Sequence, residues 1–236
     1  ELRTMVRHLI ENGDRPVSLA SLVYALSTLA RWPTAFGDSD QAEVLYDRVR
    51  DLISEDADVD AVQLLRIDRL AAEACLTAGY TRRARNSFRG TLAALQELPE
   101  EMESDVLRQT EILACKRGLA DGFLEQANGV KAQPLFAEIV EWSDTHPTVQ
   151  PAQRRQVVLS KIGLAWAAVY QANDDAVPKL LKEAKQAFDA ERTSILAAEP
   201  PPDIYVAEWL RATADDLSLL EELGVESADD VAGSQN

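Results

Sequence analysis

A short polar turn followed by an alanine and, four residues later, by a large apolar residue recurs four times in this chain of 236 residues. The four pairs are Ala42 and Tyr46, Ala84 and Phe88, Ala132 and Phe136, and Ala176 and Leu180. Residues four apart share one face of an α-helix, so the alanine permits a close helix crossing and the large residue fills the gap to a neighbouring helix pair. The pattern predicts helical hairpins that stack, because a single hairpin of this size cannot bury its apolar faces alone.

Apolar residues recur at three- and four-residue spacing along nearly the whole chain, which predicts about ten helices. Turn and breaker residues such as Gly13, Pro33, Pro147 and Gly224 set their ends. The predicted helices cover residues 1–12, 17–32, 41–54, 61–78, 82–97, 103–126, 131–145, 151–172, 175–198 and 203–223. We therefore expect one all-α domain over 1–224, with repeat units at 17–54, 61–98, 103–146 and 151–198, a terminal helix at 203–223 and an acidic flexible tail at 225–236.

The segment KIGLAWAAVYQANDDAVPKLL (161–181) carries Ile162-Gly163 in its first helix and Ala176 at the start of its second. Together with the second and third alanine–aromatic pairs, it resembles the tetratricopeptide repeat family over residues 17–190. The alanines are 42, 48 and 44 residues apart, which makes the units longer than that family's. The resemblance implies antiparallel hairpins stacked as a right-handed α-solenoid, whose first helices line a peptide-binding groove. A non-repetitive helical bundle is the alternative architecture.

The chain is strongly acidic, with 40 Asp and Glu against 24 Lys and Arg and a formal net charge of −16. This charge disfavours nucleic acid and anionic membranes, because their phosphates are repelled. It fits either solubility or the recruitment of a basic partner. No segment approaches the roughly 18 apolar residues of a membrane span, and no signal peptide is recognisable. A soluble, cytoplasmic protein is therefore favoured, although the start at Glu1 without methionine reads as a piece of a longer or processed chain.

The sequence contains no grouping of residues that is typical of catalysis or metal binding. His8 and His146 are far apart and have no metal-ligand spacing, and neither a Gly-rich phosphate loop nor a GxSxG nucleophile motif is present. Cys75 and Cys115 lie among apolar neighbours and are predicted to be buried free thiols. We therefore predict no enzyme activity, no cofactor and no metal site.

Charged residues stand at fixed offsets before the recurring alanines. Fifteen residues before them lie Ser27, Arg69, Arg117 and Lys161, and eleven residues before them lie Arg31, Glu73, Asp121 and Ala165. Regular stacking would make Arg69, Arg117 and Lys161 a basic ladder able to grip an acidic peptide or a terminal carboxylate. The alternative is ion pairing within each helix, since two of these arginines have a carboxylate four residues later. The candidate groove residues are Arg69, Glu73, Arg117, Asp121 and Lys161.

These features favour a non-enzymatic protein–protein interaction module or scaffold that binds an unidentified peptide or protein in its groove. A regulatory ligand-sensing domain of a larger protein is the alternative, and a cavity lined by Trp166 and Tyr170 beside Arg117 would favour it. An enzyme with a helical fold is a minor third hypothesis. The terminal helix 203–223 mixes apolar and acidic residues, so it could cap the last repeat or seat a second subunit in a homodimer.

Overall fold

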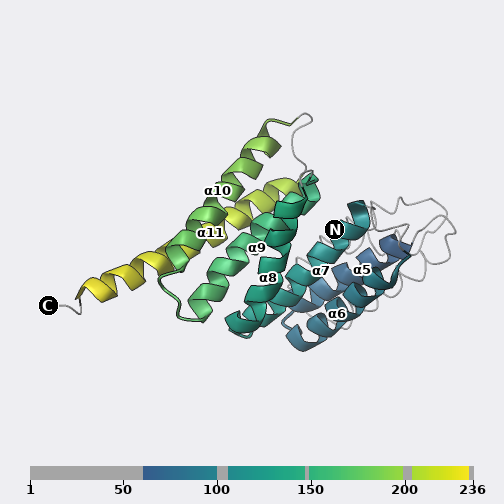
Figure 1. Cartoon of the computed structure of the whole chain (residues 1–236), viewed down its shortest axis with the longest axis horizontal. Coiled ribbons are helices and arrows are strands. Elements are labelled where there is room, and N and C mark those ends of the chain that lie inside the picture. Colours follow the sequence, from purple (N-terminus) through teal and green to yellow (C-terminus); the bar gives the residue numbers. More distant parts are fainter. Residues whose placement is uncertain (1–60, 100–105, 147–148, 199–203, 234–236) are drawn as a thin grey trace, which may run out of the picture. The chain divides into compact units, whose positions relative to one another are not determined.

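The computed structural model describes residues 61–99, 106–146, 149–198 and 204–233, and every regular element in these ranges is a helix. With the labels of Figure 1 they are α5 (Ala61–Thr77), α6 (Thr81–Glu97), α7 (Val106–Leu124), α8 (Gly129–Thr145), α9 (Pro151–Tyr170), α10 (Val177–Leu196) and α11 (Ile204–Gly233). The all-α prediction is confirmed for these residues. None of these helices contains an apolar stretch of the length that a membrane crossing requires. The three helices predicted before residue 55, the unit 17–54, Ser27 and Arg31 lie outside the described residues.

The observed bounds agree with the predicted ones to within a turn, except at the end of α11. The sequence predicts an end at Gly224, whereas α11 continues to Gly233. A glycine inside a helix costs only about 1 kcal/mol relative to alanine, and no proline follows it here. The glutamate- and alanine-containing stretch after Gly224 therefore extends the helix into the predicted tail, whose flexibility stays a prediction.

The helices α5, α7 and α9 end in the same type of turn, built on a residue with positive φ. That residue is Gly79 (φ 84°) after α5, Ala127 (φ 51°) after α7 and Ala172 (φ 50°) after α9. In each turn the next amide donates to a carbonyl five residues back: Tyr80 to Cys75 at 2.9 Å, Asn128 to Phe123 at 2.9 Å, and Asn173 to Ala168 at 3.0 Å. This is the Schellman motif, which satisfies carbonyls that a helix end leaves unpaired.

The chain divides into two compact units, the first ending at Gly122 and the second beginning at Phe123. In the first unit, α5 and α6 form a hairpin, and α7 packs on both of them (Figure 1). Phe88 of α6 is fully buried, and its ring lies directly on the backbone of α7 at Gly118. A Cβ atom built on Gly118 would lie 2.4 Å from Phe88 Cζ. Phe88 therefore fills the space between α6 and α7, and the pairing of α7 into a repeating hairpin stays a prediction.

The same contact recurs in the second unit, between α8 and α9. Phe136 of α8 is fully buried, and a Cβ atom on Gly163 of α9 would lie 2.4 Å from Phe136 Cζ. The two helices are antiparallel, because Gly129 at the start of α8 lies against Ala167 near the end of α9. The core continues over α9, α10 and α11, where one cluster comprises Val158, Ile162, Ala165, Leu181, Ala184, Phe188, Leu217 and Leu220.

The fourth alanine–apolar pair is shifted by one residue from its predicted register. Val177 and Leu181 are buried, whereas Ala176 and Leu180 are only half-buried. The positive-φ residue Ala172 stands five residues before Val177, just as Gly79 precedes Ala84 and Ala127 precedes Ala132. The assignment of Ala176 and Leu180 to this pair was therefore wrong, because the turn after α9 places α10 one residue later.

One buried arginine closes the end of α6. Arg108 of α7 is 4% exposed, and its guanidinium donates to four carbonyls at the carboxyl end of α6. The acceptors are the oxygens of Leu95 at 2.9 Å, Gln96 at 3.3 Å, Leu98 at 3.2 Å and Pro99 at 3.3 Å. A cation is favourable at this end of the helix dipole, so Arg108 both caps α6 and fixes α7 against it.

Candidate functional site

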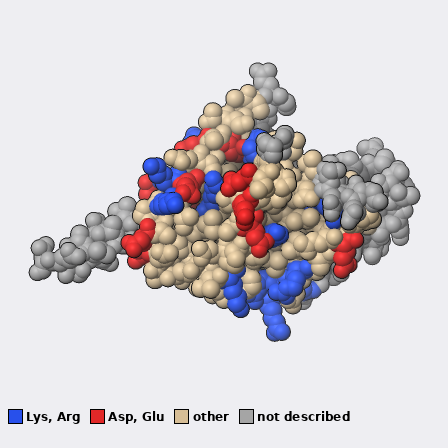
Figure 2. All heavy atoms as spheres, in the orientation of Figure 1, with Lys and Arg blue, Asp and Glu red and all other residues tan. Residues whose placement is uncertain are grey.

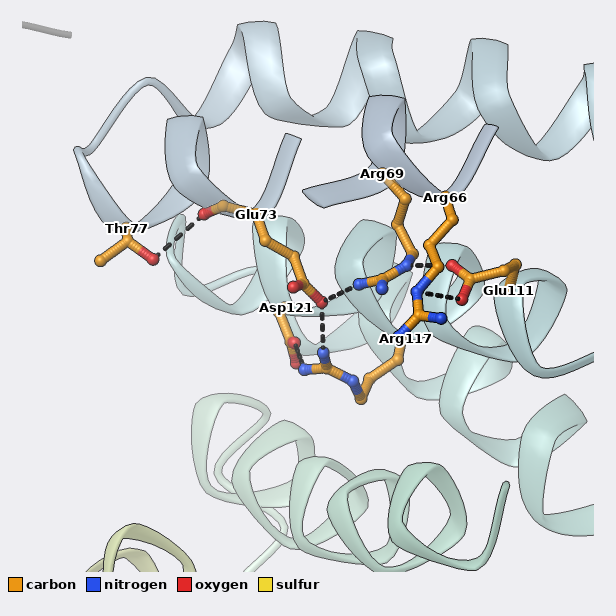
Figure 3. Close-up of polar contacts among 7 residues, drawn as sticks. All are labelled: Arg66, Arg69, Glu73, Thr77, Glu111, Arg117 and Asp121. Carbon is orange, nitrogen blue, oxygen red and sulfur yellow. Dashed lines mark hydrogen bonds and ion pairs between the residues drawn. The ribbon is translucent and has the colours of Figure 1, made fainter. Parts of the chain in front are cut away.

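The predicted groove residues of the first unit take part in one cluster of ion pairs between α5 and α7 (Figure 3). We call this cluster the ion-pair network. Three members come from α5 and three from α7: Arg66, Arg69, Glu73, Glu111, Arg117 and Asp121. On α5 the members are three, four and seven residues apart, which places them along one side of the helix. On α7, Arg117 and Asp121 are four residues apart, and Glu111 stands six residues before Arg117. The network therefore lies where α5 and α7 face each other.

The inner end of the network is buried. The side chains of Arg69 and Glu111 are 9% and 3% exposed, and Arg69 Nε donates to Glu111 Oε2. Arg66 Nε lies 3.5 Å from the other oxygen of Glu111. Burial alone would lower the pKa of Arg69, but the carboxylates of Glu73 and Glu111 outweigh it and hold that pKa above its ordinary value. The buried guanidinium thus stays charged, and its charge is compensated by facing carboxylates.

The outer end of the network is partly open to solvent and contains the pairs expected within each helix. Arg69 Nη1 lies 2.7 Å from Glu73 Oε1, and Arg117 Nη1 lies 2.5 Å from Asp121 Oδ2. The carboxylate of Glu73 also joins the two helices, because its Oε1 lies 3.0 Å from Arg117 Nη2. The side chains of Glu73 and Asp121 are each 31% exposed. A partner in solution could therefore reach this end of the network.

The charges of the network balance, with three arginines against three carboxylates. Each arginine of the network faces at least one carboxylate of the same chain. An incoming acidic peptide would have to compete with Glu73 and Asp121 for the outer arginine, Arg117. Such partly exposed ion pairs are each worth only about 0.2–1 kcal/mol, so exchanging one for an intermolecular pair costs little.

Lys161 is not part of the network. It lies on α9 in the second unit, where it is half-buried. On α10 the buried place of the recurring alanine is taken by Val177. The residues fifteen and eleven positions before Val177 are Ile162 and Trp166. The positions that correspond to Arg69 and Glu73 are therefore apolar on α9, and Lys161 stands one residue before the series. Its role in binding stays a prediction.

Sequence reasoning missed Arg66 and Glu111. Glu111 carries a recognisable signal, because it stands three and four residues before the buried Ala114 and Cys115, on the apolar side of α7. A carboxylate at such a position needs a partner inside the protein. The sequence did not show that this partner would be Arg69, because the pairing depends on how α5 and α7 align.

The two cysteines are poor nucleophiles. Burial raises the pKa of Cys115 to about 12, and burial also raises the pKa of Cys75. A thiolate is the reactive form of cysteine, so both thiols stay protonated and inert near neutral pH. In the parts of the chain that the structure describes, no three His, Cys, Asp or Glu side chains are placed to hold a metal ion together.

Comparison of the chain with models of protein families, with curated proteins and with solved structures found no significant match. The functional argument therefore depends on the packing and the charges of this chain alone.

Proposed function

We propose that this chain is a non-enzymatic protein–protein interaction module, built of helical hairpins that stack as a right-handed, tetratricopeptide-like α-solenoid of about ten helices. The observation that carries the proposal is the recurring contact of a buried phenylalanine with a glycine of the next helix, Phe88 with Gly118 and Phe136 with Gly163. The shared turn at Gly79, Ala127 and Ala172 supports it further. Repeated contacts of this kind build extended surfaces, and such surfaces typically bind other proteins.

The outer end of the ion-pair network is the part of the predicted groove that a partner would contact. Glu73, Arg117 and Asp121 present both charges there, and the side chains of Glu73 and Asp121 are each 31% exposed. A peptide with both acidic and basic side chains could exchange ion pairs with this surface at small cost. Arg69 and Glu111 would not contact the partner, and their buried ion pair would instead hold α5 and α7 in alignment.

The experiment uses the tagged protein to capture partners from a lysate of its source organism, followed by measurement of Kd with the purified partner. The test variant is Arg117→Ala with Lys161→Ala, which changes two predicted groove residues without touching the buried pair. Its matched control is Arg192→Ala with Lys182→Ala, which removes the same charges from exposed positions on α10. Circular dichroism checks that both variants keep their helix content.

We expect the test variant to weaken binding by about tenfold or more, which corresponds to about 1.4 kcal/mol, and the control to bind like the wild type. Equal weakening of both variants would mean that only the overall charge matters. If both variants bound the partner as tightly as the wild type, the groove would not be the binding site. If no specific partner were captured, the interaction-module function itself would be contradicted.

A further inference from the structure

The first half of α6 is strongly basic in a chain whose net charge is −16. Its sequence TRRARNSFRG (81–90) contains Arg82, Arg83, Arg85 and Arg89, and no acidic residue occurs before Glu97. We call these four residues the α6 arginine patch. Figure 2 shows basic side chains gathered, without acidic ones among them, along the lower edge of the molecule, where α6 begins in Figure 1. This local charge is opposite to that of the protein as a whole.

The patch opposes the local electrostatics of its own helix. The amino end of a helix carries a partial positive charge, so arginines in the first turns are unfavourable there. The first turn of α6 contains no acidic residue, and its N-cap residue Tyr80 makes no side-chain capping hydrogen bond. Arginines at these positions therefore weaken the helix. A sequence that departs from a local rule in this way is typical of a functional surface.

The geometry of α6 presents the patch to solvent on a rigid base. Arg82, Arg83 and Arg89 are exposed, and the half-buried Arg85 runs its stem over Gly122 of α7. Beneath them, Ala84 and Phe88 are fully buried and anchor the helix. The spacing of Arg82, Arg85 and Arg89 places these three along one stripe, about 10 Å long at the rise of an α-helix.

Residues beside the stripe leave room for a partner to approach. The neighbouring Asn86, Ser87 and Gly90 are small and exposed. A Cβ atom built on Gly90 would meet no other atom within 4 Å, so this glycine is not required for packing. A peptide backbone could therefore lie close to α6 along the arginines.

We propose that the α6 arginine patch docks a short acidic segment of a partner protein. A stripe of about 10 Å matches roughly three residues of an extended chain, so the segment would carry two or more carboxylates within about four residues. Guanidinium groups bind carboxylates in a planar, bidentate geometry. Long polyanions such as DNA would meet the field of the whole acidic protein. A short segment interacts mainly with charges within a Debye length of about 8–10 Å.

This surface lies on α6, apart from the ion-pair network of α5 and α7 on which the proposed function depends. Replacing exposed residues of the patch leaves all six members of the network in place. Failure of this proposal would therefore leave the groove experiment unaffected, and failure of the groove experiment would leave the patch to be tested separately.

The test measures fluorescence anisotropy of a labelled synthetic peptide of about eight residues, in which glutamate alternates with serine, in about 50 mM salt. The test variant is the triple change Arg82→Gln, Arg83→Gln, Arg89→Gln. The matched control is Lys179→Gln, Lys182→Gln, Arg192→Gln, which removes three exposed positive charges from α10. Glutamine is a good helix former, so both variants are expected to keep their helices, as checked by circular dichroism.

We expect the wild type to bind the peptide with an affinity that falls as salt rises, and the patch variant to bind at least about tenfold more weakly. The α10 control should bind within about twofold of the wild type, and a peptide with glutamine in place of glutamate should not bind. The proposal is overturned if the wild type does not bind the peptide or if both triple variants weaken binding equally. It is also overturned if a short DNA duplex or a phosphatidylserine vesicle binds the patch more tightly than the peptide, since phosphate would then be its ligand.

Discussion

The contact between Phe88 and Gly118 can be tested by adding one methyl group, with the substitution Gly118→Ala. The new Cβ atom would lie 2.4, 2.5 and 2.8 Å from three atoms of the Phe88 ring. Since carbon atoms in contact are separated by about 3.5–4 Å, the ring or the helix must move by about 1 Å. Phe88 is fully buried, and because protein interiors are closely packed, moving its ring displaces the side chains around it. The substitution should therefore strain the interface between α6 and α7.

The magnitude follows from comparison with Gly90→Ala, which has the same chemistry in open space. Alanine is favoured over glycine inside a helix by about 1 kcal/mol, so Gly90→Ala should stabilise the protein by about that amount. Gly118→Ala has the same preference of alanine for the helix, but its methyl group overpacks the interface, which costs about 1–3 kcal/mol. Because three ring atoms are approached closely, we expect the upper end of that range. The two variants should then differ by about 3 kcal/mol in the free energy of unfolding.

The assay is urea denaturation followed by circular dichroism, with the two alanine variants measured beside the wild type. A double-mutant cycle with Phe88→Leu should show a coupling of about 1 kcal/mol or more, because the smaller side chain makes room for the methyl group. Gly163→Ala with Phe136→Leu is expected to give the same pattern in the second unit. If Gly118→Ala stabilised the protein as much as Gly90→Ala does, the ring would not lie on the glycine and the packing argument would be refuted.

Three further predictions concern turns, caps and thiols. Ala127→Gly and Ala172→Gly should each raise the free energy of unfolding by about 0.5–1 kcal/mol, because glycine has no penalty at positive φ, and an unchanged urea midpoint would contradict this. Arg108→Gln should lower the free energy of unfolding by about 2–3 kcal/mol, because carbonyls at the end of α6 are left unpaired. Urea denaturation measures this change as well. Folding raises the pKa of the Cys115 thiol from 9.0 to about 12. The contribution of this thiol to the free energy of unfolding is therefore complete below pH 9, and it is lost as the pH rises toward 12 because the unfolded chain loses the thiol proton first. Ellman's reagent at pH 8 should therefore leave Cys115 unmodified in the native protein and modify both Cys115 and Cys75 after denaturation, whereas rapid labelling of native Cys115 would show that this thiol is accessible.

The sequence predicted the helices well where turn residues mark their ends. Gly79 is a glycine at a position with positive φ, and the hairpin that follows it has the predicted register. The turn after α9 uses Ala172 at the same position, where an alanine gives no signal of a left-handed conformation. The turn after α7 is built on Ala127 in the same way, yet α8 has the predicted register because an alanine, Ala132, occupies the buried position five residues later. On α10 that position is occupied by Val177 and an alanine stands directly before it, so the prediction chose Ala176. Gly224 shows the opposite failure, because a glycine that looked like a helix end lies inside α11.

The charged side of α5 and α7 shows why a site residue and a structural residue could not be separated from sequence. Arg69 and Arg117 have the spacing of a binding ladder and also the spacing of intrahelical ion pairs, and the structure contains the ion pairs. Spacing along one helix reveals partners on that helix only. The buried carboxylate of Glu111 belongs to a different helix, and only the alignment of α5 with α7 brings it to Arg69.

That alignment has a consequence for the proposed groove. A buried ion pair contributes little net stability compared with apolar residues, but a buried charge that loses its partner is strongly destabilising. If α7 slid by one turn along α5 in the direction away from Arg66, Glu111 would lose both of its arginines and lie unpaired in an apolar interface. The pair therefore penalises this change of register and favours the alignment that places Arg117 and Asp121 beside Glu73 at the exposed end. A residue need not touch a partner to define the surface that the partner meets, and this is the role that the proposed groove assigns to Arg69.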